Sequence, residues 1–138
     1  MNKLFALRGA VQCENTVQDI CKQVSLMYDE LLLVNNLAET DIVSVIFSVT
    51  DDLNAVNPCS ALRKSGSSFD GETAADGFAC FPRASETALF AVQEPNCQNS
   101  LERTIRVIIH CYLDEGTKVK HVYRNGAEVL RPDRAVNR

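Results

Sequence analysis

The first forty residues change from a pattern typical of a strand to one typical of a helix. Residues 3–11 are mostly apolar at both odd and even positions, with Arg8 as the interior charge, which predicts a strand with two largely apolar faces. From Thr16 apolar residues recur at intervals of three and four, which predicts an amphipathic helix of about five turns. Thr16 and Asp19 resemble a capping box at its start, and the asparagine pair at 35–36 is a plausible end.

The middle of the chain contains a second strand pattern and a segment with no periodicity. Residues 42–50 are mostly apolar and β-branched, as in a strand covered on both faces, and the run ends in turn-forming residues at 51–54. A short helix is expected at about 55–64, with Pro58 tolerated in its first turn. Residues 65–79 contain three of the six glycines, which predicts a long loop inserted into the domain.

The last third of the chain predicts three more strands. They are expected at 87–93, 103–113 and 118–123, with a turn or short helix at about 95–101. Because only the turn-forming segment 114–117 separates the last two, we expect these to form a hairpin. No internal repeat or second domain is evident, so residues 1–138 are interpreted as one domain with a flexible insertion at about 65–79.

Composition and charge exclude several partners. The chain has 138 residues, 46% of them hydrophobic, which is enough for a core that needs neither disulfides nor metal. Its net charge is -4 and no run is rich in Lys or Arg, which argues against a nucleic-acid or anionic-membrane partner. The longest apolar stretches, such as 42–49, are too short to span a bilayer, and Arg8 comes too early for a signal peptide. We therefore expect a soluble, cytoplasmic protein.

The cysteines and histidines show no metal-site or redox pattern. Six cysteines are spread along the chain without C-x-x-C spacing, and His110 and His121 stand eleven positions apart without flanking ligands. Free thiols, no metal and no cofactor are expected. The chain also lacks the G-x-S-x-G, P-loop and G-x-G-x-x-G motifs, which argues against acyl-enzyme chemistry, nucleotide hydrolysis and dinucleotide binding.

Polar residues on the expected strands are the candidates for chemistry. Arg8 and Arg106 lie within apolar strands, Glu94 follows another, and Tyr123 ends the last. A guanidinium in such a strand pairs with a carboxylate, faces solvent or binds an anionic ligand. Nine arginines against five lysines favour planar recognition of carboxylates, so a small anionic ligand would fit. Without a nucleophile, metal or obvious general base, such a site would act by positioning and electrostatic stabilisation.

Several separate motifs follow one another in the order and spacing of a known family. They are Leu7-Arg8-Gly9-Ala10, Thr50-Asp51-Asp52-Leu53-Asn54-Ala55-Val56-Asn57-Pro58, Gln93-Glu94, Ile105-Arg106-Val107, His121-Val122-Tyr123 and Val129-Leu130-Arg131-Pro132-Asp133. With these motifs the chain resembles the AroH-type (Bacillus-type) monofunctional chorismate mutases. The match covers nearly the whole chain, and only residues 65–85 or so fall outside it.

The resemblance implies a fold, an assembly and an activity. The fold would be α+β, ferredoxin-like or chorismate-mutase-like, with a mixed β-sheet packed against a long α-helix. The assembly would be a homotrimer in which the sheets form a pseudo-α/β-barrel, with active sites at subunit interfaces. The activity would be the rearrangement of chorismate to prephenate in phenylalanine and tyrosine biosynthesis, which needs no cofactor.

The resemblance also assigns roles residue by residue. Arg106 would donate to the ether oxygen as the carbon–oxygen bond breaks, where a fixed cation favours the transition state. Glu94 would accept a hydrogen bond from the ring hydroxyl, and Arg8 and Tyr123 would contact substrate carboxylate. Further binding residues would come from a neighbouring helix and the C-terminal tail: Arg63, Leu130 and Arg131.

Three positions depart from the family pattern. Asn57 replaces a usual phenylalanine, Ser60 a common lysine, and Ala91 a cysteine of the site. By their positions, the resemblance still places Asn57 and Ala91 among the substrate-binding residues. Loss of an aromatic wall and a cation weakens packing and anion attraction at the pocket. The alternative hypothesis is therefore a non-catalytic trimeric domain that binds a small carboxylate or serves as a scaffold, and another is a different enzyme on the same fold.

Overall fold

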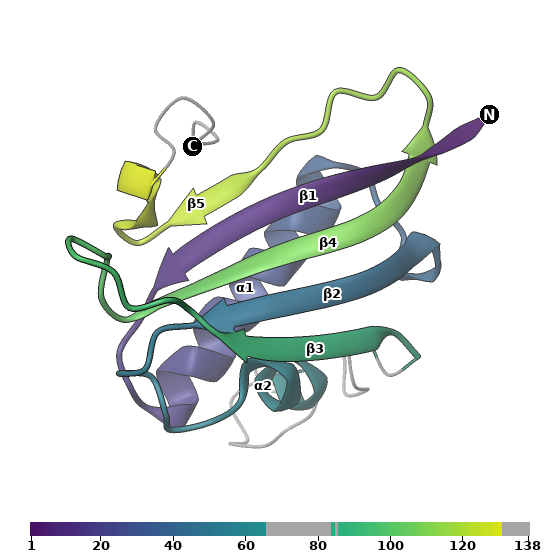
Figure 1. Cartoon of the computed structure of the whole chain (residues 1–138). Helices are drawn as coiled ribbons and strands as arrows, with labels where there is room; N and C mark the ends of the chain where they lie inside the picture. The colour runs from purple at the N-terminus through teal and green to yellow at the C-terminus, as the bar shows by residue number, and fades with distance from the viewer. Residues whose placement is uncertain (66–83, 85, 131–138) are drawn as a thin grey trace.

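The computed structural model describes residues 1–65, 84 and 86–130 (Figure 1). These residues form a five-stranded mixed sheet with strand order β3-β2-β4-β1-β5, together with two α-helices. The elements in chain order are β1 (Asn2–Gln12), α1 (Val17–Val34), the 3-10 turn η1 (Glu39–Asp41), β2 (Ile42–Val49), α2 (Pro58–Ser65), β3 (Ala88–Gln93), β4 (Thr104–Asp114), β5 (Val122–Arg124) and the 3-10 turn η2 (Ala127–Leu130).

The central strand β4 pairs antiparallel with both β1 and β2. β1 and β2 therefore run parallel with β4 between them, and α1 connects them as in the split βαβ unit of ferredoxin-like folds. The second half departs from that plan, because β3 lies directly beside β2 in parallel, with α2 in the connection. The expected α+β fold with a mixed sheet is confirmed.

The helix α1 begins where the sequence predicts, with Thr16 as its N-cap. Thr16 Oγ1 accepts a hydrogen bond from the backbone N–H of Asp19 at 3.0 Å. The Asp19 carboxylate accepts from the N–H of Glu14 at 2.6 Å instead of that of Thr16, so the capping box is half formed. At the other end, Asn35 Nδ2 donates to the carbonyl of Leu31 at 2.8 Å. Side-chain hydrogen bonds thus fix both ends of this helix.

The helix α2 is capped by a residue that the sequence analysis had assigned only to substrate binding. Asn57 Oδ1 accepts the backbone N–H of Cys59 at 2.8 Å, and the Asn57 carbonyl accepts the N–H of Ala61 at 2.9 Å. Pro58 is the first helical residue, where its missing N–H costs nothing. The helix therefore starts three residues later than the expected 55–64. Beyond Ser65, the loop expected at 65–79 lies outside the described residues.

The hydrophobic core lies between one face of the sheet and the two helices, which cover that same face (Figure 1). Both layers contribute side chains that are fully buried, and the bulkiest are Tyr28, Phe47, Leu7, Ile20, Met27, Leu31, Leu62, Ile105 and Ile109. None of the helices in the described part of the chain covers the opposite face.

The uncovered face of the sheet is rich in apolar side chains. Leu4, Phe90, Val92 and Tyr112 point to this side and are 50%, 63%, 43% and 46% exposed. The expectation that residues 42–50 form a strand covered on both faces is wrong within a single chain, because the outward residues of β2 are only half-buried. Alternation along β2 places Val45 and Phe47 in the core on the helix side, whereas Ile46 points to the open face.

The last two strands do not form the expected hairpin. β5 pairs parallel with β1, which separates it from β4. The physical reason is that β1 pairs with β4 along its whole length of 11 residues and fills that edge. The strand expected at 118–123 shortens at its start, because the side chain of Asn35 binds the backbone N–H and carbonyl of Lys120 at 2.8 and 2.9 Å.

The described residues contain no helix that is both long and apolar enough to cross a membrane. The five cysteines among them are free, with Cys97 exposed and the others buried.

Candidate active site

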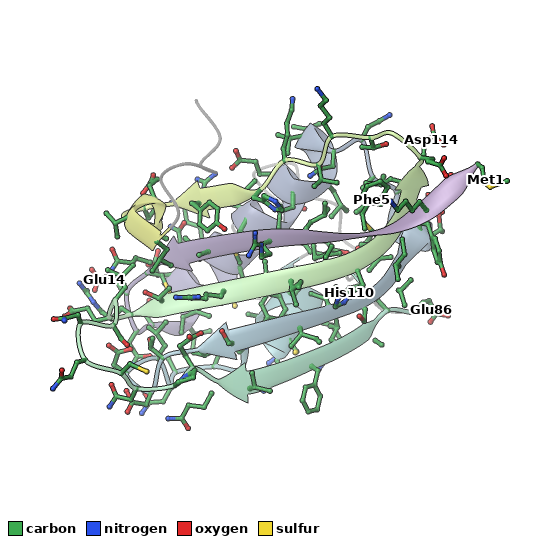
Figure 2. All side chains as sticks on the ribbon, turned by 45° about the horizontal axis from the view of Figure 1, so that its top comes forward. Met1, Phe5, Glu14, Glu86, His110 and Asp114 are labelled. Carbon is green, nitrogen blue, oxygen red and sulfur yellow. The ribbon has the colours of Figure 1, made fainter. Side chains whose placement is uncertain are left out.

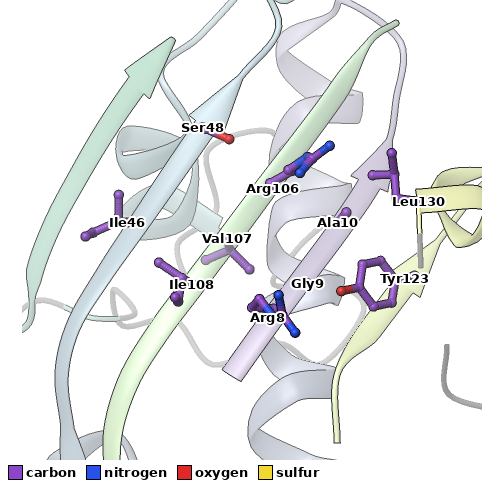
Figure 3. Close-up of a pocket in the computed structure, with 10 residues that line it drawn as sticks. All are labelled: Arg8, Gly9, Ala10, Ile46, Ser48, Arg106, Val107, Ile108, Tyr123 and Leu130. Carbon is purple, nitrogen blue, oxygen red and sulfur yellow. The ribbon is translucent and has the colours of Figure 1, made fainter. Parts of the chain in front are cut away.

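A pocket of about 340 Å³ opens on the uncovered face of the sheet (Figure 3). Strands β1, β2, β4 and β5 and the turn η2 all contribute to its wall. The lining residues are Arg8, Gly9, Ala10, Ile46, Ser48, Arg106, Val107, Ile108, Tyr123 and Leu130. The structure therefore brings together four residues that were predicted from the sequence, Arg8, Arg106, Tyr123 and Leu130, from both ends of the chain.

Strand register explains why these side chains meet. Ala10 pairs with Arg106 on one side and Tyr123 on the other, and Arg106 pairs in turn with Ser48. Residues in register on neighbouring strands point to the same face of a sheet. Arg8 belongs to the adjacent cross-strand row on that face, two residues earlier on β1. The pocket is thus built on rigid strands rather than loops.

The carboxylate of Glu94 stands at the edge of this arrangement. Its backbone N–H donates to the carbonyl of Val49 at 2.8 Å, which continues the β2–β3 pairing one step past the end of β3. Its Oε1 accepts a hydrogen bond from the Ser48 hydroxyl and lies 3.7 Å from Nε of Arg106. The Glu94 side chain is 19% exposed and that of Arg106 49%. Because Arg106 is half exposed, solvent screens this ion pair.

Arg8 and Tyr123 are tied together through the residue that precedes β5. The backbone N–H of Arg8 donates to Nδ1 of His121 at 3.0 Å, and His121 is 7% exposed. An Nδ1 that accepts this bond belongs to an imidazole that carries its proton on Nε2. Tyr123 is 4% exposed and packs with Ala10 and Ala127, beside Leu130 of η2. His121 therefore couples the strand that bears Arg8 to the strand that bears Tyr123.

The charges of the site favour an anionic ligand. Two guanidiniums, Arg8 and Arg106, line the pocket, and one carboxylate, Glu94, lies beside Arg106. Tyr123 and Ser48 bring hydroxyls to the same face. Guanidiniums bind carboxylates through paired N–H donors, and a fixed cation stabilises negative charge that develops during a reaction. Within the described residues, no group of three or more His, Cys, Asp or Glu side chains could hold a metal ion.

The remaining predicted binding residues do not reach this pocket within one chain. Asn57 and Ala91 line a second pocket of about 380 Å³ at the ends of β2 and β3. Ala91 pairs with Phe47 of the core and so points to the helix side of the sheet. Arg63 is exposed on α2 and lines neither pocket. Arg131 lies outside the described residues.

Two residues of the site, Ser48 and His121, were not predicted from the sequence. Ser48 had a readable signal, because it and Ser44 interrupt an apolar strand at positions that share one face. His121 was part of a recognised motif, but its bond to the backbone of Arg8 spans 113 positions and has no local sequence signature.

Fold and site together define an α+β protein whose open sheet face carries a pocket lined by two arginines. The model of the chorismate mutase type I family matches residues 4–134, so the chain belongs to that family. It is thereby an isomerase of the chorismate mutase class, and the family resemblance seen in the sequence is confirmed.

Individual relatives agree with this assignment. The chain is 27% identical over 129 residues to the chorismate mutase AroH of Bacillus subtilis (strain 168), across 92% of this chain and 89% of that protein. Its fold is similar to a solved chorismate mutase from Clostridium thermocellum, with a TM-score of 0.72 and 36% identity. That similarity covers 91% of this chain and 98% of the other.

Proposed function

We propose that the pocket around Arg106 converts chorismate to prephenate without a cofactor. In this rearrangement the bond between the ether oxygen and the ring breaks while a carbon–carbon bond forms between the side chain and the ring. No atom enters or leaves the molecule. The observation that carries the proposal is the position of Arg106, held on the central strand between Arg8 and Glu94 and facing the open pocket.

Arg106 is the proposed catalytic group. The ether oxygen gains negative charge only as its bond to the ring breaks, so a guanidinium directed at that oxygen stabilises the transition state more than the ground state. The strand holds the guanidinium in place before the reaction, so the guanidinium does not have to reorient as the carbon–oxygen bond breaks. Glu94 accepts a hydrogen bond from the ring hydroxyl and so fixes the ring relative to Arg106. Arg106 thus stabilises the developing charge, and Glu94 orients the ring.

Arg8, Tyr123 and the C-terminal residues are proposed to hold the substrate. Chorismate is a dianion, and Arg8 and Tyr123 offer N–H and O–H donors to a carboxylate from neighbouring strands. Leu130 lines the same pocket. The family resemblance assigns Arg131 to substrate binding as well, and we keep that role as part of the proposal. Binding of this kind restricts the substrate to a reactive conformation, which accelerates a one-molecule rearrangement by positioning.

The predicted binding residues that lie outside the Arg106 pocket support a homotrimer with shared active sites. Asn57, Arg63 and Ala91 lie near the edge strand β3, away from the pocket of their own chain. An exposed apolar sheet face and an unpaired edge strand both favour burial against another copy. In the proposed trimer, this edge of one subunit completes the Arg106 pocket of the next, and the sheets form a pseudo-α/β-barrel. The reaction is proposed to serve phenylalanine and tyrosine biosynthesis in the cytoplasm.

The direct test of the activity follows the ultraviolet absorbance of chorismate after purified protein is added, with prephenate identified in the product. Loss of absorbance with formation of prephenate is expected. The alternative, a non-catalytic carboxylate-binding or scaffold protein, predicts at most a rise in melting temperature on adding chorismate, without turnover.

Shared sites are tested by mixing two inactive variants. Arg106→Ala removes one side of the proposed site and Arg63→Ala the other. After the two are unfolded together and refolded as mixed trimers, roughly a quarter of the sites contain both native sides, because each site pairs two subunits at random in a closed ring. Recovery of that share of activity supports shared sites. No recovery from mixed trimers would show that each subunit forms its site alone.

A further inference from the structure

Ser48 touches the proposed catalytic pair but has no role in the chemistry described above. It lies on β2 in register with Arg106, lines the pocket, and donates its hydroxyl hydrogen to Oε1 of Glu94. The same Oε1 is the oxygen 3.7 Å from Arg106 Nε. Ser48 thus makes the shorter of these two contacts to the carboxylate.

We infer that Ser48 is a positioning residue that orients the Glu94 carboxylate toward the substrate. The inference rests on the proposed function, because it assigns Glu94 to the ring hydroxyl. With Oε1 held from the sheet by Ser48, Oε2 is the oxygen directed at the ligand. The role of Ser48 is exerted through Glu94, and Ser48 makes no contact with the reacting atoms.

Glu94 needs such support because of where it lies. It follows the last residue of β3, and its own N–H makes the last backbone bond to β2. A glutamate side chain has several rotatable bonds, and holding it in one orientation costs conformational entropy. Arg106 alone cannot hold it firmly, because that side chain is 49% exposed and the separation of 3.7 Å is long for a hydrogen bond.

A neutral hydrogen-bond donor such as the Ser48 hydroxyl also suits the separate roles proposed for Arg106 and Glu94. If Arg106 closed fully on Glu94, its N–H groups would be engaged by the carboxylate and less available to the substrate oxygen. The hydroxyl of Ser48 holds the carboxylate without neutralising its charge. Ser48 therefore leaves the guanidinium of Arg106 available for the ether oxygen.

The strand provides a matched control. Ser44 is the other serine on the outward face of β2, and its Oγ lies 3.1 Å from Nδ1 of His110 (labelled in Figure 2). Ser44 and Ser48 share strand, face and partial burial. Ser44 does not line the pocket. A substitution at Ser44 thus reproduces the loss of a hydroxyl from this strand without affecting Glu94.

The experiment compares kcat and KM for chorismate in wild type, Ser48→Thr, Ser48→Val and Ser44→Ala. Thr and Val have the same shape, so they differ at Ser48 only in the hydroxyl. We expect about a tenfold loss of kcat/KM for Ser48→Val, as for one hydrogen bond to a charged group, and values within about twofold of wild type for the other two. Equal activity of Ser48→Thr and Ser48→Val would overturn the inference.

A second comparison shows whether Ser48 acts through Glu94. In a Glu94→Ala background, Ser48→Val is expected to cause no further loss of kcat/KM, because the group that it orients is gone. An undiminished loss in that background would overturn the inference. A crystal structure of Ser48→Val should show the carboxylate turned away from its native orientation, and an unchanged carboxylate would also overturn it. Wild type without turnover would refute the proposed function itself, and with it this inference.

Discussion

Gly9 provides a quantitative test of how tightly the strands are packed beneath the pocket. It lies on β1 opposite Val122 of β5, between Arg8 and Ala10. A Cβ atom at this position would lie 3.1 Å from Leu31 Cδ1, 3.1 Å from the Val122 carbonyl oxygen and 3.2 Å from Met27 Sδ. All three separations are shorter than ordinary van der Waals contacts. Gly9→Ala therefore overpacks the junction of β1, β5 and α1.

The cost of this substitution follows from what can move. Leu31 and Met27 are fully buried, so neither side chain has free space to enter, and the third contact is backbone of β5. Overpacking of a filled core costs about 2 kcal/mol. At roughly 4 °C per kcal/mol for a chain of this size, the melting temperature falls by about 8 °C. Displacement of β5 also moves Tyr123 away from Arg8, so KM for chorismate rises several-fold.

The assay is thermal unfolding together with steady-state kinetics, and Gly116→Ala is the control. Gly116 follows the end of β4, does not line the pocket, and has a φ of +93° but no atom within 4 Å of an added Cβ. Its substitution costs about 1 kcal/mol through backbone strain alone, without a change in KM. If Gly9→Ala keeps both the wild-type melting temperature and the wild-type KM, the close approach of β1 and β5 does not define the pocket.

Three further predictions concern stability. Thr16→Ala removes the N-cap of α1 and should lower the free energy of unfolding by about 1 kcal/mol in urea titrations, whereas Thr16→Ser should not. Burial, with added repulsion from acidic neighbours, raises the pKa of the Cys13 thiol from 9.0 to about 12. The unfolded chain therefore loses this proton first, and wild type should lose stability relative to Cys13→Ala as pH rises from about 9 to 12, while parallel curves would contradict this. His121→Leu leaves the Arg8 N–H without its acceptor and should cost about 1–3 kcal/mol, which His121→Asn should partly restore in the same titrations.

Local sequence patterns predicted the elements but not how distant strands pair. The helix α1 and the strands β1, β2, β3 and β4 follow from periodicity and caps within each segment. The hairpin between the last two strands was wrong because the register of β1 with β4 links residues about a hundred positions apart. A short turn between two strands favours a hairpin only where that edge is free. Asn57 is the opposite case, since an asparagine before a proline is a local helix-start signal that was overlooked.

The candidate site, like the fold, was predicted only in part from the sequence. Arg8, Arg106, Tyr123 and Leu130 were selected from the sequence, and strand register brings them together in one pocket. Ser48 could be noticed in the sequence as a polar interruption of an apolar strand, but its neighbours across the sheet are known only once β2 is aligned with β4. The separation of Ala91 from this pocket likewise depends on which face of β3 it occupies, and that of Asn57 on where α2 begins.

The fixed charge of Arg106 is proposed to drive the rearrangement, and the rest of the mechanism depends on it. The measurement that tests it is kcat for chorismate in wild type, Arg106→Lys and Arg106→Ala, with Lys3→Ala, on the exposed start of β1, as a charge-loss control. We expect kcat to fall by about a hundredfold or more for Arg106→Ala, as for loss of an electrostatic donor in an active site, and by less for Arg106→Lys, with folding and assembly unchanged. Lys3→Ala should match wild type. A folded and assembled Arg106→Ala variant with the kcat of wild type would contradict the mechanism.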